Sequence, residues 1–111
     1  MKKSTFFVLA TTIFTLTTSS AAVYKGQRIF KKECMTCHKD GAKFVASHNA
    51  KYWKDITLKD GAPLKKLHEK ETKAKASLAY FNSKKYTKKL KHLREFLVKY
   101  AKGSGNVPVL H

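Results

Sequence analysis

Apolar residues recur along most of this chain at the three- and four-residue spacing that is typical of amphipathic helices. Residues 24–33 are predicted to form a short helix with Ile29 and Phe30 facing inward. A long helix is predicted over 63–81, and a last helix over 86–102 with Gly103 as its C-terminal cap. The expected inward faces of these two helices are Leu64, Leu67, Ala74, Leu78 and Phe81, and Leu90, Leu93, Phe96, Leu97 and Tyr100. Because no strand-like alternation is present, the pattern predicts an all-α fold.

The segments between these helices are shorter and more polar. Residues 39–47 are expected to be a loop, whereas 49–56 are predicted to form one or two helical turns capped by Asn49. Residues 60–63 have turn chemistry, and Pro63 suits the first turn of the next helix. Residues 104–111 form a tail without a clear pattern.

The N-terminus has the three regions of a secretory signal peptide: a basic head, an apolar stretch over 6–16, and small residues before Val23. The apolar stretch is short for a membrane span, so we expect cleavage rather than retention as an anchor. Cleavage after Ala22 would remove a signal peptide of 1–22, and cleavage one residue earlier is the alternative. The first cleavage would leave a domain over 23–103 and the tail 104–111, exported to the periplasm.

The size of the chain indicates that its core needs support. A domain of fewer than 111 residues buries limited apolar surface, and small domains are usually completed by a disulfide, a metal or a cofactor. The chain has two cysteines, Cys34 and Cys37. A disulfide between them would close too small a loop to constrain the unfolded chain strongly. We therefore expect a bound group to complete the core.

Cys34, Cys37 and His38 form the sequence Cys-x-x-Cys-His, the attachment signature of c-type haem. Two thiols one helical turn apart can add to the two vinyl groups on one edge of a porphyrin. His38 then lies under the ring, where one imidazole nitrogen can bind iron and the other can donate to a carbonyl or water. A thioredoxin-like pair would need a preceding strand, and a zinc site would need two further ligands at suitable spacing. The motif predicts one covalent haem c with His38 as the proximal iron ligand, and predicted export supports it, because haem is attached outside the cytoplasm.

The residues around this motif resemble those of class I cytochromes c. Gly26 and Phe30 precede Cys34 at regular spacing, and an apolar helix follows near the C-terminus. The resemblance implies a small monohaem domain in which the N- and C-terminal helices cross and the glycine lets their backbones approach. Phe44 and Val45 could then cover the haem. The resemblance is good at both ends of the mature chain and poor in its middle.

The chain departs from this family at the second axial ligand of iron. Most class I cytochromes use a methionine from the loop before the last helix, but this chain has only Met1 and Met35. Met1 would leave with the signal peptide, and Met35 lies inside the attachment loop. His68, at the border of an apolar helix face, is our first candidate for the distal ligand. The alternative is an exposed His68 among charged residues. If no residue at all binds the distal side, the iron is five-coordinate.

The remaining candidates for the distal ligand are weaker. His48 follows His38 closely and is expected on the proximal side, where it could bind a propionate instead. His92 lies away from the centre of its helix stripe, and His111 ends the tail. Lysine at 84 or 85, where the family's methionine loop would lie, could bind iron only with a lowered pKa.

The chain is strongly basic, with 24 lysines and arginines against 7 acidic residues and a net charge of +17. Such charge is common in nucleic-acid-binding domains, but predicted export and the lack of a basic platform interleaved with aromatic residues argue against that partner. We expect a monomeric one-electron carrier, not an enzyme, steered towards an acidic redox partner or an anionic membrane surface bearing one. The lysines could also simply solvate the helices. The alternative function is a haem-based ligand-binding or sensor protein with an open or displaceable sixth site.

Overall fold

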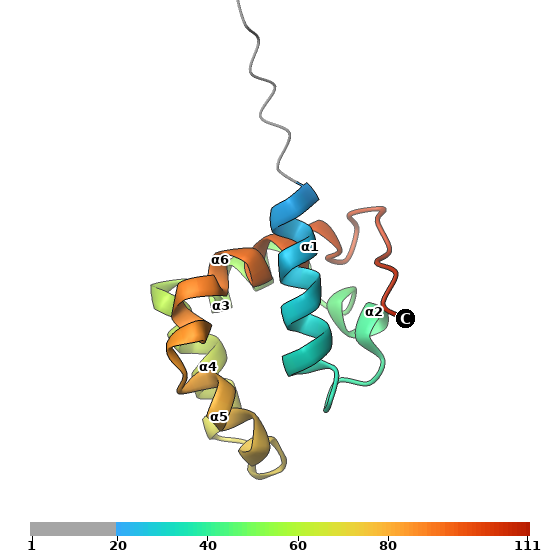
Figure 1. Cartoon of the computed structure of the whole chain (residues 1–111). Coiled ribbons are helices and arrows are strands. Elements are labelled where there is room, and N and C mark those ends of the chain that lie inside the picture. Colours follow the sequence, from blue (N-terminus) through green and yellow to red (C-terminus); the bar gives the residue numbers. More distant parts are fainter. Residues whose placement is uncertain (1–19) are drawn as a thin grey trace, which may run out of the picture.

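The computed structural model describes residues 20–111, so most of the predicted signal peptide lies outside the described residues. Six α-helices are present in this part: α1 (Ser20–Ile29), α2 (Gly41–Val45), α3 (Ala50–Ile56), α4 (Ala62–Glu69), α5 (Leu78–Phe81) and α6 (Lys84–Lys99). The π-helical turn η1 (Phe30–Cys34) continues α1, and two 3₁₀ segments, η2 (Lys59–Gly61) and η3 (Thr72–Ser77), flank α4. Residues 20–111 contain no strand, only an isolated bridge between Asn49 and Lys102, so the all-α prediction is confirmed (Figure 1).

The N- and C-terminal helices α1 and α6 cross, as the family resemblance implied (Figure 1). Their closest approach is at Gly26, where an added Cβ would lie 1.9 Å from the His92 carbonyl oxygen and 2.7 Å from Cβ of Phe96. Only a residue without a side chain fits there. Beside the crossing, Phe30 and Phe96 are fully buried with ring centroids 5.0 Å apart. The crossing therefore depends on one glycine and one aromatic pair.

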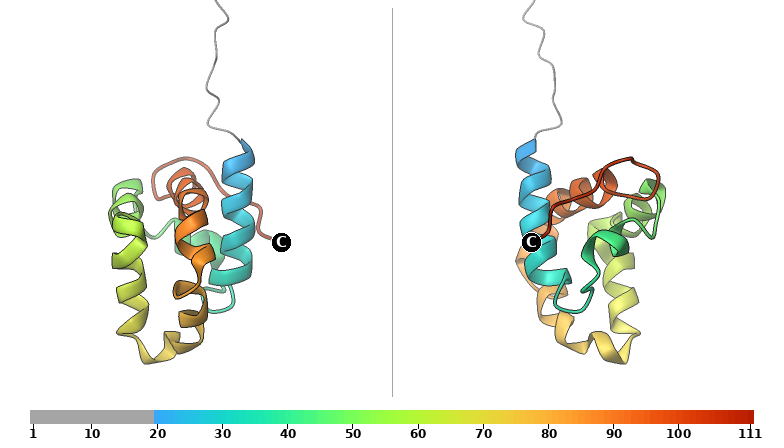
Figure 2. Two further views of the ribbon diagram at one scale, coloured as in Figure 1. Left: turned by 60° about the vertical axis from the view of Figure 1, so that its left-hand side comes forward. Right: turned by 90° about the vertical axis from the view of Figure 1, so that its right-hand side faces the viewer.

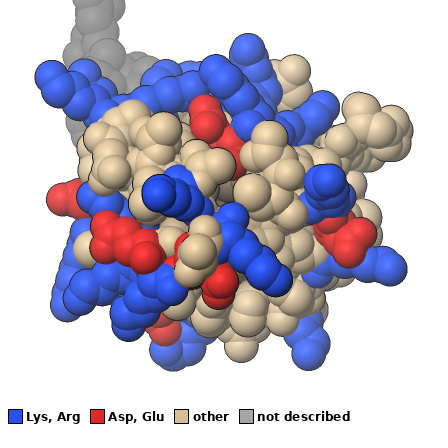
Figure 3. All heavy atoms as spheres, turned by 90° about the horizontal axis from the view of Figure 1, so that it is seen from below, with Lys and Arg blue, Asp and Glu red and all other residues tan. Residues whose placement is uncertain are grey.

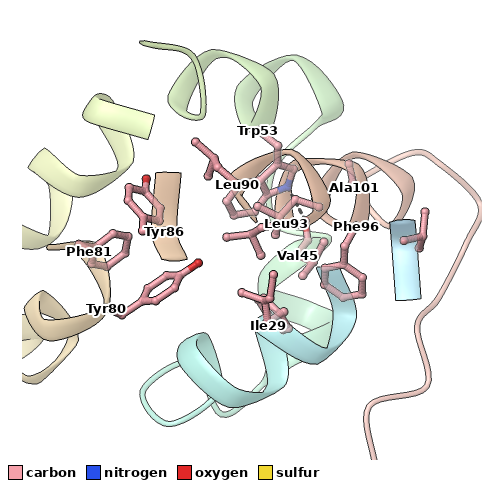
Figure 4. Packing of buried hydrophobic residues seen from close by; sticks show 13 residues of the cluster. Ile29, Val45, Trp53, Tyr80, Phe81, Tyr86, Leu90, Leu93, Phe96 and Ala101 are labelled. Atoms are coloured by element: carbon pink, nitrogen blue, oxygen red, sulfur yellow. Dashed lines mark hydrogen bonds between the residues drawn. The ribbon is translucent and has the colours of Figure 1, made fainter. Parts of the chain in front are cut away.

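The core lies between α6 and the elements that pack around it. Figure 4 shows side chains of α6, among them Leu93 and Phe96, directed towards residues of α1, α2 and α3. Trp53 is almost fully buried, and its indole N–H donates to the Val45 carbonyl oxygen at 3.0 Å. This hydrogen bond satisfies the one polar atom of a large side chain and ties α3 to α2. The predicted inward face of the last helix is confirmed at Leu90, Leu93, Phe96 and Leu97.

The prediction of a single long helix over 63–81 is wrong. The chain forms α4, η3 and α5 in its place, and Glu71 has extended backbone dihedrals between α4 and η3. The only apolar residues in η3 are alanines, so little side-chain packing favours a continued α-helix there. The two views in Figure 2 show α4 and the following segment reversing direction to return towards α6. Pro63 lies in the first turn of α4, as predicted.

Three smaller predictions can also be compared with the structure. Residues 39–47 are not simply a loop, because they contain the short helix α2. The Asn49 cap is confirmed: its side chain accepts from the Tyr52 backbone N–H at 2.9 Å. The last helix ends at Lys99 with Tyr100 as its cap, so the Gly103 cap is wrong. The Lys102 N–H donates instead to the His48 carbonyl oxygen at 2.8 Å, which turns the chain towards α3 before it reaches Gly103.

The tail after Gly103 packs against the rest of the domain. The side-chain amide of Gln27 donates to the Val109 carbonyl oxygen at 2.7 Å, and Pro108 is buried. Leu110 and Met35 both contact Gly41, within about 3 Å of the position a Cβ would take. The tail therefore returns along α1 to the outer side of the attachment loop (Figure 1). None of the helices in residues 20–111 combines the length and the apolar character needed to cross a membrane.

Candidate functional site

The Cys-x-x-Cys-His segment forms a tight turn at the end of η1. The Cys37 and His38 backbone N–H groups both donate to the Cys34 carbonyl oxygen, at 3.3 and 2.9 Å. The Met35 N–H donates to the Phe30 carbonyl oxygen at 3.1 Å, which closes the π-helical turn. Such turns are rare and are found frequently at functional sites. Here the turn brings both thiols and the His38 imidazole to one wall of a cavity.

This cavity has a volume of about 340 Å³, within the range of about 300 to 1,000 Å³ typical of ligand pockets. Its walls come from η1, α3, α4, the η3–α5 segment and α6, and they are largely apolar. The lining residues are Phe30, Glu33, Cys34, Cys37, His38, Phe44, His48, Tyr52, Trp53, Ile56, Leu64, Leu67, His68, Glu71, Lys73, Ala74, Ser77, Phe81, Leu93 and Leu97. Four of the five residues predicted on the face of a long helix line it, although that helix is broken.

The thiols of Cys34 and Cys37 do not match a catalytic redox pair, because the environment of Cys34 disfavours its thiolate. They are not bonded to each other, and burial raises the pKa of the Cys34 thiol to about 12, with the charges of Glu33 and Cys37 adding to the effect. Reactive cysteines in redox motifs have lowered pKa values, which make the thiolate available at neutral pH. Within residues 20–111, no group of three or more His, Cys, Asp or Glu side chains is placed to hold a metal ion by itself.

His38 lies against Phe44, with ring centroids 3.7 Å apart and the planes 14° from parallel. Burial lowers the pKa of His38, and the nearby His68 lowers it further. The neutral imidazole is therefore favoured, and this is the form that binds metal ions. Stacking on Phe44 also restricts the orientation of the ring.

His68 lies across the cavity from the attachment turn, and its ring centroid is 6.2 Å from that of His38. A metal–imidazole bond is about 2 Å long and the ring centre lies about 1.2 Å behind the bonding nitrogen, so two imidazoles on opposite sides of one metal ion have centres about 6.4 Å apart. Nδ1 of His68 is 2.8 Å from the Leu64 carbonyl oxygen. If it donates there, Nε2 keeps its lone pair for a metal.

The remaining candidates for the distal ligand are less well placed. His48 lines the cavity but stacks on Tyr52, with ring centroids 3.7 Å apart. His92 lies at the α1–α6 crossing, where its buried Nδ1 has no hydrogen-bond partner within residues 20–111. His92 and His111 are not among the residues that line the cavity in the described part of the chain.

Met35, Lys84 and Lys85 likewise do not contribute to the cavity wall formed by residues 20–111. Met35 contacts Gly41 on the side covered by the tail, and the Lys85 ammonium is 3.9 Å from the Glu33 carboxylate. Lys73 lines the cavity, although no sequence pattern selects it. A continuous helix over 63–81 does not indicate Lys73 as a cavity residue, because the position of Lys73 depends on the break at Glu71. Phe81 beside His68 was expected only as a core residue.

These residues fit a haem. Two thiols and an imidazole occupy one wall, the lining is apolar, and a second imidazole lies opposite at a spacing that suits one metal ion. The fold and this site define a small all-helical protein that holds a haem. The sequence model described as Cytochrome c matches residues 23–105, so the chain belongs to the cytochrome c family and carries covalently attached haem c. Neither a comparison with curated proteins nor one with solved structures gave a match.

Proposed function

We propose that this protein is a periplasmic one-electron carrier whose haem c is attached at Cys34 and Cys37 and held between His38 and His68. The observation that carries the proposal is the 6.2 Å separation of the two imidazole rings across the cavity. Family membership supports electron transfer rather than catalysis. When bound, haem iron supplies reversible one-electron chemistry by cycling between its ferric and ferrous states.

The chain's own residues have distinct tasks in this proposal. The Leu64 carbonyl accepts from Nδ1 of His68 and so fixes the tautomer that leaves Nε2 free. Phe44 orients His38, and the apolar walls exclude water from the site. Imidazole on both sides of the iron gives a lower reduction potential than a histidine–methionine pair, because methionine ligation raises it. The protein therefore suits electron transfer at low potential.

The position of His68 favours this carrier over a sensor with an open sixth site. Its ring packs on Phe81 with centroids 4.3 Å apart, and the half-buried residue lines the cavity. An external ligand would have to compete with an imidazole that is already held at the site.

The basic surface supports an acidic redox partner. Figure 3 shows many lysines and arginines on the face seen from below Figure 1, most of them towards its edge, with fewer acidic residues among them and uncharged residues between. A positively charged surface raises the rate of encounter with an acidic protein, or with an anionic membrane that bears one, while leaving the complex able to dissociate. We propose that the exported protein acts as a monomer and uses this surface to orient its partner. The signal peptide of residues 1–22 remains a prediction.

The carrier function is tested by a redox titration followed by stopped-flow electron exchange. We expect reversible one-electron reduction and rapid exchange with an acidic redox protein, slowing by about tenfold or more from low to high salt. Exchange with an uncharged small-molecule reductant is the control, and its rate should change little. A haem that does not reduce reversibly, or exchange whose rate is unaffected by salt, would contradict the proposal.

A further inference from the structure

The corner between α3 and α4 has an unusual backbone. Three consecutive residues, Lys59, Asp60 and Gly61, have φ angles of 52°, 55° and 76°, in the left-handed region. Two of these residues carry a Cβ, so the conformation is unfavourable for them. Such backbone persists when surrounding structure fixes it, and it occurs often at functional sites. This corner leads directly into α4, the helix that carries His68.

The corner is attached to α6 by a hydrogen bond from Tyr86. The phenolic O–H donates to the Gly61 carbonyl oxygen at 2.7 Å, and the Tyr86 side chain is almost fully buried. The fit is close, because an added Cβ at Gly61 would lie 2.1 Å from the phenolic oxygen. Gly61 is buried and is the N-cap of α4, so this bond joins α6 directly to the start of that helix.

A second route connects Tyr86 to His68 through side chains. The Tyr86 and Phe81 rings meet edge to face with centroids 4.9 Å apart, and Phe81 then packs on His68 at 4.3 Å. Tyr86 therefore supports both the start of α4 and, through Phe81, the imidazole near its end. Figure 4 shows Tyr86 and Phe81 side by side in this part of the core.

Arg94, two turns further along α6, fixes the other side of the same corner. Its Nε donates to Oγ1 of Thr57 at 2.8 Å, and its Nη2 donates to the Thr57 carbonyl oxygen at 2.5 Å. Thr57 is fully buried and closes the end of α3. Two residues of α6, Tyr86 and Arg94, therefore hold the strained α3–α4 corner, one on each side of it.

We propose that Tyr86 is a positioning residue for the distal ligand: it fixes the α3–α4 corner and the Phe81 ring, and so holds His68 against the iron. The inference rests on the proposed ligation by His38 and His68. Residues outside the first coordination sphere commonly orient a ligand in this way, and their loss weakens metal ligation. Arg94 supports the same corner from the other side, so its contribution should be smaller.

The test measures how often His68 leaves the iron. Carbon monoxide binds the reduced protein only when the sixth position is free, so its binding rate reports the unligated fraction. Tyr86→Phe removes the hydrogen bond and keeps the ring, and we expect binding to be faster by about tenfold, as for loss of a buried hydrogen bond. Tyr100→Phe, at the C-cap of the same helix, is the matched control and should bind at the wild-type rate. Arg94→Lys should shift the rate in the same direction by a smaller factor.

The outcomes separate this inference from the function on which it rests. If wild type binds carbon monoxide slowly and His68→Ala binds it fast, the ligation stands, and an unchanged rate in Tyr86→Phe overturns the positioning role. A lowered melting temperature with an unchanged rate would assign Tyr86 to stability alone and also overturn it. If wild type binds as fast as His68→Ala, the proposed ligation fails first, and the inference fails with it.

Discussion

A valine at position 26 is expected to prevent the domain from folding. The first carbon of any side chain there would lie 1.9 Å from the backbone oxygen of His92, so α1 and α6 would have to separate. Separation would open the packing of Phe30 on Phe96, and exposing a buried phenylalanine would cost an amount comparable to its removal, about 3 to 5 kcal/mol. Overpacking typically adds about 1 to 3 kcal/mol. The sum approaches the whole stability of an ordinary domain, about 5 to 15 kcal/mol.

Circular dichroism and thermal unfolding of Gly26→Val would measure this effect. Gly103→Ala is the control, because an added Cβ at that position meets nothing within 4 Å. It should cost only about 1 to 2 kcal/mol for the left-handed backbone. A Gly26→Val protein with wild-type helix content and melting temperature would show that the two helices do not approach as described.

Replacement of His68 by methionine is expected to raise the reduction potential strongly. The change would replace the proposed imidazole with the thioether that most class I cytochromes use, which stabilises the ferrous state relative to imidazole. Axial ligands set haem potentials over about 0.8 V, so we expect an increase on the order of 100 mV. The side chain at 68 faces the same cavity as His38, which gives a flexible methionine access to the iron.

Spectroelectrochemical titration of wild type and His68→Met would measure the shift. His48→Met is the matched control, since His48 also lines the cavity but stacks on Tyr52. It should leave the potential near the wild-type value. A potential that moves with His48→Met and not with His68→Met would transfer the distal role to His48.

The two ends of the domain were predictable because local sequence determines them. Gly26, Phe30 and the cysteine motif lie at fixed spacing on one continuous helical segment, and the apolar face of α6 repeats regularly. Helical periodicity and a family pattern are sufficient for such features. The prediction of a covalent haem rested on three residues, Cys34, Cys37 and His38.

The middle of the chain was less predictable because tertiary contacts determine it. A helical projection treats 63–81 as one helix, but the break at Glu71 and the turn through η3 depend on where α5 meets α6. The place of Lys73 in the cavity wall and the hydrogen bond from Tyr86 to Gly61 both depend on how these segments pack in three dimensions. A sequence pattern could therefore not indicate either feature. The position of the tail was unpredictable for the same reason, because Gln27 binds Val109, which lies far away in the sequence.

The central claim is that His38 and His68 hold the iron between them. Low-temperature electron paramagnetic resonance of the ferric protein tests it most directly, with His68→Ala and His48→Ala measured beside wild type. We predict low-spin iron in wild type and in His48→Ala, with the strong anisotropy expected for imidazole planes that are 86° apart, and high-spin iron in His68→Ala. A low-spin signal that is unchanged in His68→Ala would contradict the claim.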